Sequence, residues 1–349
     1  MTLVSDKVQQ ALAREGITEQ SITRLGEGAW HEAYFLEKDK LVLRIPKKKA
    51  YDKKVVFNRD ELEAEYAGTK AFYQQANHAV EGICPDYFTY YVSEDLTYTL
   101  ETYVGRTIPL EHQSVEEAKQ YGLELGECFV QLEKLDAPYP GMGYLVMEDG
   151  ALKGPYDMDA KEFLIQETEE YKEELETILT SSYPFDKEAV KTKAEELLSD
   201  RSIDQEKIVF TNQDTSPENI LFTENGAKMI DPFPLLATGT SLAANHVFNY
   251  TLLFPQFHNT ERYKKGNYDL HKDKLRANAD GFVEGYTDGS EKKKDALRIE
   301  VFIKLLTMAF EHHQLLGLDA MSREEVIRYG TKHQVEERLR FYLEELERF

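Results

Sequence analysis

Cysteine is scarce in this chain of 349 residues, which contains only Cys84 and Cys128. Two cysteines allow at most one disulfide and lack the paired spacing of a metal site, so we expect two buried, inert thiols. The sequence has no apolar run as long as a membrane span, and its first residues carry charges where a secretory signal would be apolar. We therefore expect a cytoplasmic protein without a membrane partner.

Basic residues are also in deficit, with 42 Lys and Arg against 64 Asp and Glu, and a formal net charge of −22. Proteins that bind nucleic acid concentrate positive charge on one face, so we do not expect a nucleic-acid partner. A negative field would attract cationic small molecules. Acidity also keeps proteins soluble, so charge alone leaves both interpretations open. We expect a small-molecule partner and a monomer or weak homodimer.

Apolar residues are plentiful, at 41% of the chain, and include 21 Tyr and 18 Phe. This composition supplies a core and argues against disorder despite the high charge. The length exceeds that of one average domain, which predicts two lobes.

The first third of the chain is typical of a small sheet. Residues 22–46 contain three β-prone runs, split by a glycine turn and by residues 37–40. A helix is predicted after Glu61, and two aromatic-rich strands follow Pro85. Within 41–46, alternation places Val42 and Arg44 on the same face.

Helical patterns dominate from about Val115 onward. Residues 160–179 and the C-terminal residues read as amphipathic helices, and residues 297–310 are apolar almost all round, as in a buried helix. One island of strand and turn residues, 208–234, interrupts them. Glu224-Asn225-Gly226 predicts a hairpin within this island.

The island carries the residues with the clearest chemistry. Asp214 is followed five residues later by Asn219, and Asp231 follows an apolar pair after the hairpin. Phosphoryl transfer from ATP needs a carboxylate that orients the attacking hydroxyl, together with oxygen ligands for magnesium. These three residues can supply both. The alternative that they are ordinary turn residues stays open at this point.

With Asn212-Gln213 before Asp214, this arrangement resembles the catalytic loop of the aminoglycoside phosphotransferase and choline kinase group, within the protein-kinase-like superfamily. The resemblance extends over nearly the whole chain. It implies a bilobal α+β fold with a small antiparallel β-sheet lobe and one main helix, residues 1–104, and a larger mostly helical lobe, residues 105–349. It further implies that Asp214 is the catalytic base and that Asn219 and Asp231 bind Mg²⁺.

The same resemblance assigns a nucleotide site in the first lobe. Gly26 and Gly28 would let the backbone approach the phosphates, Val42 would touch adenine, and Arg44 would contact phosphate in place of the usual Lys. ATP is the implied donor, and GTP is not excluded.

Two further assignments complete this site. An acidic residue of the following helix should pair with the Arg44 guanidinium; Glu65 is the first choice and Glu61 the alternative. The backbone groups of Glu101 and Tyr103 would bond the edge of adenine.

The chain departs from the family pattern at two positions. Asn212 replaces a His before the catalytic dipeptide, and Asn245 stands where an Asp would brace the loop. We hypothesise that a neutral amide network replaces the usual bracing. The competing interpretation is a degenerate kinase that binds nucleotide without turnover.

The family binds its acceptor over the helical lobe through acidic and aromatic residues. The candidates in this sequence are Asp157, Asp159, Glu167, Glu170 and Tyr268. A solvated helix face explains a Glu-rich segment equally well. The resemblance thus implies an ATP-dependent phosphotransferase acting on a hydroxyl of a small, cationic molecule, aminoglycoside-like or an amino alcohol. The alternatives are a choline or ethanolamine, methylthioribose or homoserine kinase, or an inactive nucleotide-binding regulator.

Overall fold

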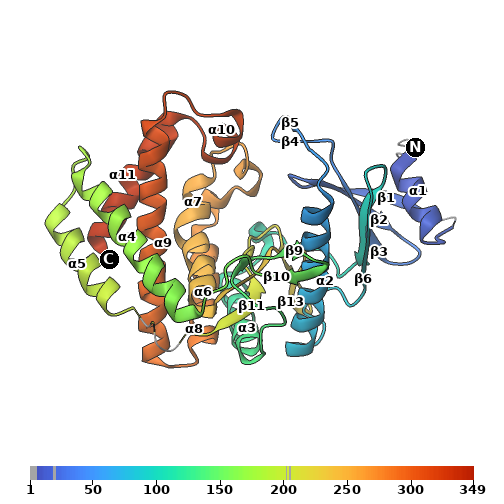
Figure 1. Ribbon diagram of the computed structural model, residues 1–349, viewed down its shortest axis with the longest axis horizontal. Helices are drawn as coiled ribbons and strands as arrows, with labels where there is room; N and C mark the ends of the chain where they lie inside the picture. The colour runs from blue at the N-terminus through green and yellow to red at the C-terminus, as the bar shows by residue number, and fades with distance from the viewer. Residues whose placement is uncertain (1–5, 19–20, 202, 204–205) are drawn as a thin grey trace.

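The computed structural model describes residues 6–18, 21–201, 203 and 206–349 and contains two lobes, one built on a sheet and one mostly helical (Figure 1). The sheet lobe contains a five-stranded antiparallel sheet in the order β1-β2-β3-β7-β6. Its strands are β1 (Ile22–Glu27), β2 (His31–Leu36), β3 (Leu41–Pro46), β6 (Phe88–Val92) and β7 (Thr97–Thr102). A small hairpin of β4 (Lys49–Ala50) and β5 (Lys53–Lys54) and the helices α1 (Asp6–Arg14) and α2 (Arg59–Ala79) complete this lobe.

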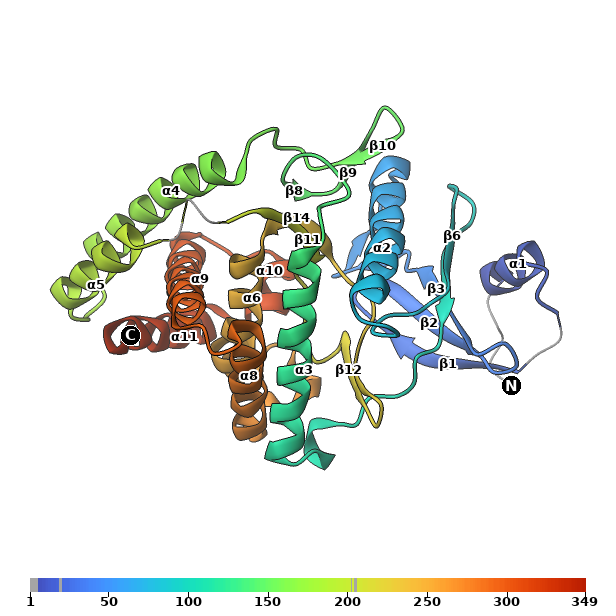
Figure 2. The same ribbon diagram turned by 90° about the horizontal axis from the view of Figure 1, so that it is seen from below.

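Alternation along β3 divides its side chains between two environments, as predicted. Leu43 and Ile45 are buried and join Val8 and Leu12 of α1 in a small core on the outer face of the sheet. Arg44 points to the opposite face, toward the helical lobe, where it approaches Asp231. Helix α2 covers that inner face of the sheet (Figure 2). One strand therefore supplies both an outer core and a cation at the junction of the lobes.

The helical lobe is built mainly from long helices. They are α3 (Val115–Lys134), α4 (Ala160–Thr180), α5 (Lys187–Ser199), α6 (Gly239–Phe248), α7 (Phe254–Phe257), α8 (Lys272–Thr287), α9 (Glu291–Gly317), α10 (Arg323–Tyr329) and α11 (Lys332–Arg348). A π-helical turn at Asn249–Leu253 joins α6 to α7, and short 3₁₀ turns lie at Leu110–His112, Lys264–Gly266 and Tyr268–Leu270. The short strands are β8 (Gly143–Tyr144), β9 (Val146–Glu148), β10 (Ala151–Lys153), β11 (Ile208–Asn212), β12 (Ile220–Thr223), β13 (Gly226–Met229) and β14 (Pro234–Thr238).

Helices α3 and α8 lie against each other at unusually close range because each carries two glycines one turn apart. A Cβ atom at Gly122 would lie 1.9 Å from the carbonyl oxygen of Asn278, and one at Gly126 would lie 2.3 Å from that of Phe282. Gly285 meets the backbone of α3 in the same way, with 2.2 Å to the carbonyl oxygen of Leu123. Any side chain at these positions would force the helices apart. The segment 281–286 therefore packs rather than reacts.

The amphipathic pattern of residues 160–179 is confirmed, because Leu164, Tyr171, Leu175 and Ile178 are all buried. Helix α4 packs on α9, whose residues Leu297 to Ala309 are largely buried, as the apolar run predicted. The C-terminal helix α11 closes this core.

The strand and turn island predicted at 208–234 forms β11, the β12–β13 hairpin and the start of β14. Strand β11 pairs with β14, and Thr223 pairs with Gly226 across the turn, whose glycine has a φ of +88°. The hairpin holds its two ends side by side, since the N–H of Ile230 donates to the carbonyl of Asn219 (2.9 Å).

The lobes are joined by the segment between Thr102, where β7 ends, and Val115, where α3 begins. The predicted boundary after residue 104 falls within this segment. Helix α2 also contacts the helical lobe directly, because Gly68 leaves room for Leu145, whose Cδ1 would lie 2.9 Å from a Cβ there. None of the described helices is both long and apolar enough to cross a lipid bilayer.

Candidate active site

The loop between β11 and β12 holds Asp214 in a fixed orientation. Its Oδ1 accepts a hydrogen bond from the backbone N–H of Ser216 (3.0 Å), and its Oδ2 accepts one from Nδ2 of Asn219 (2.8 Å). Burial raises the pKa of Asp214, the Ser216 bond opposes this, and the nearby charge of Asp231 raises it further. The carboxylate is therefore poised to accept a proton more readily than an exposed Asp would be.

Asp231 lies beside this pair at the other end of the hairpin. Nδ2 of Asn219 also donates to the backbone carbonyl of Asp231 (3.3 Å), so the predicted base and both predicted metal ligands are neighbours. Asp231 has a left-handed φ of 45°, and its carboxylate remains 48% exposed. The unusual backbone conformation directs a charged group outward from an otherwise apolar strand end.

Arg44 links the sheet lobe to this centre, but its partner differs from the one predicted. Both Nε and Nη2 of Arg44 lie 2.9 Å from Oε1 of Glu101, and Nη1 lies 3.8 Å from Oδ2 of Asp231. The expected pair with Glu65 is therefore wrong. The physical reason is that Arg44 and Glu101 project from adjacent strands onto the same face, where Glu101 is 2% exposed and needs a cation. Burial alone would lower the pKa of Arg44, but the charges of Glu101 and Asp231 raise it overall.

Tyr73 of α2 connects these charged groups. Its hydroxyl donates to Oε2 of Glu101 (3.0 Å) and accepts the backbone N–H of Asp231 (3.1 Å). The two carboxylate oxygens of Glu101 are thus both used, one by Arg44 and one by Tyr73. This chain of contacts fixes β3, β7, α2 and the backbone of Asp231 relative to one another.

Glu65 and His31 lie near the same centre, and Glu65 does not form the ion pair with Arg44 that was predicted. Glu65 is in contact with solvent, but the surrounding protein atoms reduce the hydration of its carboxylate. This partial desolvation and the negative charge of Asp231 raise the pKa of Glu65 to about 7. His31 shares a hydrogen bond of 2.9 Å with the hydroxyl of Tyr66, and burial lowers its pKa. His31 lies just after the glycine turn, and no sequence pattern singled it out.

The turn between β1 and β2 has the open surroundings expected of a phosphate-covering loop. A Cβ atom on Gly26 or Gly28 would meet no atom within 4 Å. The N–H of Gly28 donates to the carbonyl of His31 (2.9 Å), which shapes the turn. Val42 is 6% exposed and faces the inner side of the sheet with Arg44.

The backbone groups predicted to bond adenine are already engaged. Glu101 lies inside β7, paired with both neighbouring strands, and the N–H of Tyr103 donates to the carbonyl of Lys40 (2.8 Å). The prediction that Glu101 contacts adenine through its main chain is therefore wrong, and its side chain pairs with Arg44 and Tyr73. An adenine contact would have to use the carbonyl of Tyr103 or the backbone groups that follow it.

The two departures from the family pattern do form an amide network. Oδ1 of Asn212 accepts the N–H groups of Asp214 (3.0 Å) and Phe233 (2.8 Å), and its Nδ2 donates to the carbonyl of Asp214 (2.8 Å). Nδ2 of Asn245 donates to the carbonyl of Gln213 (2.9 Å). Neutral side chains therefore brace the loop from both sides.

His246, which follows Asn245, adds a contact that sequence reasoning missed. One ring nitrogen lies 2.9 Å from Oγ1 of Thr215, and the other lies 3.0 Å from Oδ1 of Asn278 on α8. Complete burial lowers the pKa of His246 to about 3, although the Asn278 bond opposes this. A neutral imidazole thus ties the catalytic loop to the glycine-packed helix pair.

The acidic residues proposed for the acceptor lie away from this centre or have structural partners. Glu167 pairs with the buried Arg201 (2.6 Å), which also binds Glu300 of α9. Asp159 caps α4 by accepting the N–H of Glu162 (2.8 Å). Helix α4 lies at the far side of the helical lobe from the sheet (Figure 1).

Of the remaining candidates for binding the acceptor, two lie on the surface and one lines a cavity beside the loop that contains Asp214. Asp157 is exposed, and Glu170 accepts a bond from Gln166 (3.1 Å) on the surface of α4. Tyr268 is the exception, because it is 3% exposed and lines a cavity of about 180 Å³ together with Pro217 of the catalytic loop.

A second bridge joins the lobes through the β4–β5 hairpin. Lys53 pairs with Glu324 of α10 (3.0 Å), and Arg323 pairs with Asp52 (3.1 Å) and with Glu261 (3.0 Å). These ion pairs are exposed, so salt will weaken them. Figure 1 shows the hairpin reaching toward α10 at the upper edge of the junction.

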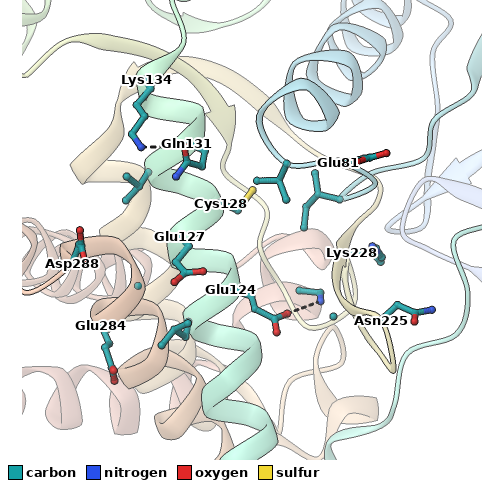
Figure 3. A pocket seen from close by; sticks show the side chains of 17 residues that line it. Glu81, Glu124, Glu127, Cys128, Gln131, Lys134, Asn225, Lys228, Glu284 and Asp288 are labelled. Atoms are coloured by element: carbon teal, nitrogen blue, oxygen red, sulfur yellow. Dashed lines mark hydrogen bonds between the residues drawn. The ribbon is translucent and has the colours of Figure 1, made fainter.

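A cavity of about 740 Å³ lies away from Asp214, between α3, the end of α2, the end of α8 and the β12–β13 hairpin. Glu124 of α3 is directed toward the hairpin (Figure 3). Glu124 accepts the N–H of Ala227 there (3.3 Å). We place the site at Asp214, because converging oxygen ligands rather than volume define phosphoryl transfer.

Magnesium fits the residues present. Among the described residues, no group of three or more His, Cys, Asp and Glu side chains could hold a metal ion. Mg²⁺ needs few protein ligands, since water and phosphate oxygens complete its octahedron. Two suitable oxygen donors are present: the half-exposed carboxylate of Asp231 and the Oδ1 atom of Asn219. The amide of Asn219 is oriented by the hydrogen bond from its Nδ2 to Asp214.

Comparison with known proteins rests on solved structures, since no family model and no curated protein matches the sequence. A choline/ethanolamine kinase family protein from Mesorhizobium loti matches with a TM-score of 0.51 and 14% identity, over 98% of this chain and 100% of that one. Aminoglycoside phosphotransferase APH(4)-Ia matches with a TM-score of 0.55 and 12% identity, over 99% of both chains. The ADP-bound APH(2'')-Ib gives a TM-score of 0.54 and 13% identity, also over 99% of both.

The chain has the fold of these kinases. The bilobal kinase-like architecture predicted from the catalytic-loop motif is therefore confirmed, and at identities this low the likeness concerns the fold alone.

The Tyr73 bridge can be tested by the substitution Tyr73→Phe. Removing the hydroxyl leaves Oε2 of the buried Glu101 unpaired, so we expect a loss of about 2 kcal/mol in urea unfolding. Tyr121→Phe is a matched control, because that hydroxyl donates to a neutral carbonyl (3.3 Å). Equal losses in the two variants would contradict a special role for the charged network.

The amide network predicts the effect of Asn245→Asp. An ionised Asp cannot donate to the Gln213 carbonyl and would repel it, so stability should fall by about 1–3 kcal/mol. Any phosphoryl-transfer rate should fall as well. Asn225→Asp, at the exposed hairpin turn, serves as the control. An improved enzyme would show that the loop still favours the carboxylate.

His246 predicts a specific pH dependence of stability. Because its folded pKa is about 3 and the unfolded value is 6.5, the unfolded state binds the proton first as pH falls below 6.5. Stability is then lost by about 1.4 kcal/mol per pH unit between these values. His246→Gln should unfold more easily at pH 7 but show a shallower decline in melting temperature toward pH 4. An unchanged slope would mean that the imidazole is not buried in its neutral form.

Proposed function

We propose that this protein is an ATP-dependent kinase that transfers the γ-phosphoryl group to a hydroxyl of a small molecule. The observation that carries the proposal is the convergence of Asp214, Asn219 and Asp231, linked by two hydrogen bonds from one amide, at the junction of the lobes. Arg44 reaches the same point from the sheet lobe. This set matches the few groups that phosphoryl transfer requires.

Each residue has a role that follows from its geometry. Asp214 would orient the acceptor hydroxyl and take its proton, since its carboxylate is held in place by Ser216 and Asn219. Asn219 and Asp231 would hold Mg²⁺, which when bound with ATP offsets the charge that develops on the phosphoryl oxygens. Arg44 would contact the phosphates, with Glu101 and Tyr73 keeping its guanidinium in position.

Nucleotide binding is supported by the neighbours and by the turn between β1 and β2. APH(4)-Ia is known as ternary complexes with ADP and hygromycin B and with AMP-PNP and hygromycin B. In this chain the open space above Gly26 and Gly28 would accommodate the phosphates. We propose ATP as the donor, with GTP as an alternative. The backbone groups that follow Tyr103 would receive the base.

The acceptor is proposed to be a small molecule handled in the cytoplasm by a monomer or weak homodimer. The acidity of the chain argues against nucleic acid. The residues of α4 no longer support a cationic acceptor, because Glu167 neutralises Arg201 and Asp159 caps the helix. An aminoglycoside-like molecule or an amino alcohol is still the proposed acceptor, and choline, ethanolamine, methylthioribose and homoserine are the alternatives.

Asp214→Asn separates an enzyme from a regulator that only binds nucleotide. ATP consumption is measured in the presence of hygromycin B, choline, ethanolamine, methylthioribose or homoserine. We expect the rate in the variant to fall by roughly 10²- to 10⁴-fold, because the proton acceptor is lost. The dissociation constant for MgATP should change by less than about threefold, within the roughly 0.6 kcal/mol expected when no nucleotide contact is removed. Asp200→Asn, at the end of α5, is the control. A wild-type protein that binds MgATP but never consumes it would refute the kinase assignment.

A further inference from the structure

Two exposed aromatic rings flank the catalytic loop and have no role in the chemistry described above. Tyr144 of β8 and Phe233, which follows Asp231 by two residues, are each 47% exposed. Their ring centroids lie 4.8 Å apart, with an angle of 31° between the planes. We call this pair the aromatic ledge.

The aromatic ledge is unusual within the described part of the chain, where most of the Phe and Tyr rings are buried or partly buried. The exposed ones are Phe57, Tyr87, Tyr144, Tyr156 and Phe233. Of these, only Tyr144 and Phe233 contact each other, as a tilted pair. Paired, half-exposed rings beside a reactive centre are a feature of binding sites rather than of ordinary surface.

The aromatic ledge is rigidly attached to the catalytic loop. The hydroxyl of Tyr144 donates to Oε1 of Gln213 (2.7 Å), the residue before Asp214. The N–H of Phe233 donates to Asn212 (2.8 Å), and the N–H of Gln213 donates to the carbonyl of Phe233 (3.1 Å). Both rings are therefore presented without mobile segments, which lowers the entropic cost of binding against them.

Backbone geometry also fixes which rings belong to the aromatic ledge. Tyr156 lies on the other face of β8, because it packs where the side chain of Gly143 would be, 3.0 Å from a Cβ atom there. The ring of Tyr144 instead lies against that of Phe233, with 4.8 Å between the ring centroids. The pair lies beside the loop that carries Asp214, because Tyr144 is hydrogen-bonded to Gln213.

We propose that the aromatic ledge binds the acceptor by stacking against a ring with a flat, largely apolar face, and so selects ring-bearing alcohols over acyclic ones. This inference rests on the proposed kinase function and names the acceptor class for the same site. A sugar ring and an aromatic ring both offer such a face. Tyr144 and Phe233 are therefore specificity-determining residues, while Asp214 remains the catalytic one.

The test compares ATP-dependent phosphorylation of two sets of alcohols. The ring-bearing set is myo-inositol, methyl glucoside, hygromycin B and pyridoxine, and the acyclic set is glycerol, ethanolamine and homoserine. We expect transfer to at least one ring-bearing compound and a preference for that set. Methyl glucoside and pyridoxine separate a sugar-ring from an aromatic-ring acceptor.

Variants of Phe233 make the test specific to a flat ring. Phe233→Leu keeps apolar bulk but removes the face, so KM for the ring-bearing acceptor should rise about 5- to 50-fold, by analogy with the loss of one stacking ring. Phe233→Trp restores a flat face and should return KM to near the wild-type value. In both variants the KM for the ring-bearing acceptor is compared with the KM for ATP, because general damage to the site would raise both values, whereas loss of the flat ring should raise the acceptor value far more. Tyr87→Ala, an exposed ring on the sheet lobe, is the control.

The outcomes distinguish the two proposals. Preference for acyclic alcohols, an unchanged KM in Phe233→Leu, or failure to use any ring-bearing compound despite ATP hydrolysis that depends on Asp214 overturns the role of the aromatic ledge and leaves the kinase assignment intact. A change of oligomeric state in Phe233→Leu would also overturn it, since the rings would then form a self-interface. Absence of both transfer and hydrolysis overturns the kinase assignment itself.

Discussion

The arrangement of this site depends on how one buried carboxylate is satisfied. Glu101 is almost fully removed from water, and a buried charge is tolerated only when it is paired and hydrogen-bonded. Arg44 and Tyr73 meet that requirement from β3 and α2, and Tyr73 passes the constraint on to the backbone of Asp231. The position of Asp231, the proposed metal ligand in the helical lobe, is thereby tied to the strands of the sheet lobe.

The pairing of Arg44 with Glu101 differs from the predicted ion pair between a cation on a strand and a carboxylate on a helix. Here α2 contributes a neutral hydroxyl, while the carboxylate comes from β7, so Glu65 remains free of Arg44 and keeps a raised pKa. A strand-to-strand pair is held by the sheet register and does not require the helix to move into place. The cation is therefore oriented by the fold itself, before any ligand is present.

Neutral side chains hold the loop that contains Asp214 in place. Asn212 satisfies two N–H groups and one carbonyl, Asn245 satisfies another carbonyl, and His246 bridges to α8 without a charge. Amide side chains carry both donor and acceptor, so they can replace a charged brace without the desolvation of a buried ion. The departures from the family motif thus leave the geometry of Asp214 intact.

The sequence alone determined the elements that depend on local pattern. Strand alternation, helical periodicity and the Asn-Gly turn located the sheet lobe, the long helices and the hairpin. The spacing of Asp214, Asn219 and Asp231 predicted that these residues would lie together, as they do. Alternation along β7 places the side chain of Glu101 on the same face as those of Thr97 and Thr99. The sequence does not indicate which strand lies beside β7, so the partner of Glu101 could not be predicted.

Only the tertiary structure decided the partners of those residues. The sequence pattern pointed to Glu65 or Glu61 of α2 as the partner of Arg44, whereas the order of strands, which brings β7 next to β3, made Glu101 the partner. Glu167 reads as a solvated or substrate-binding residue until the fold places Arg201 beside it. Burial and pairing between distant segments arise from long-range packing, to which neither periodicity nor spacing along the chain is sensitive.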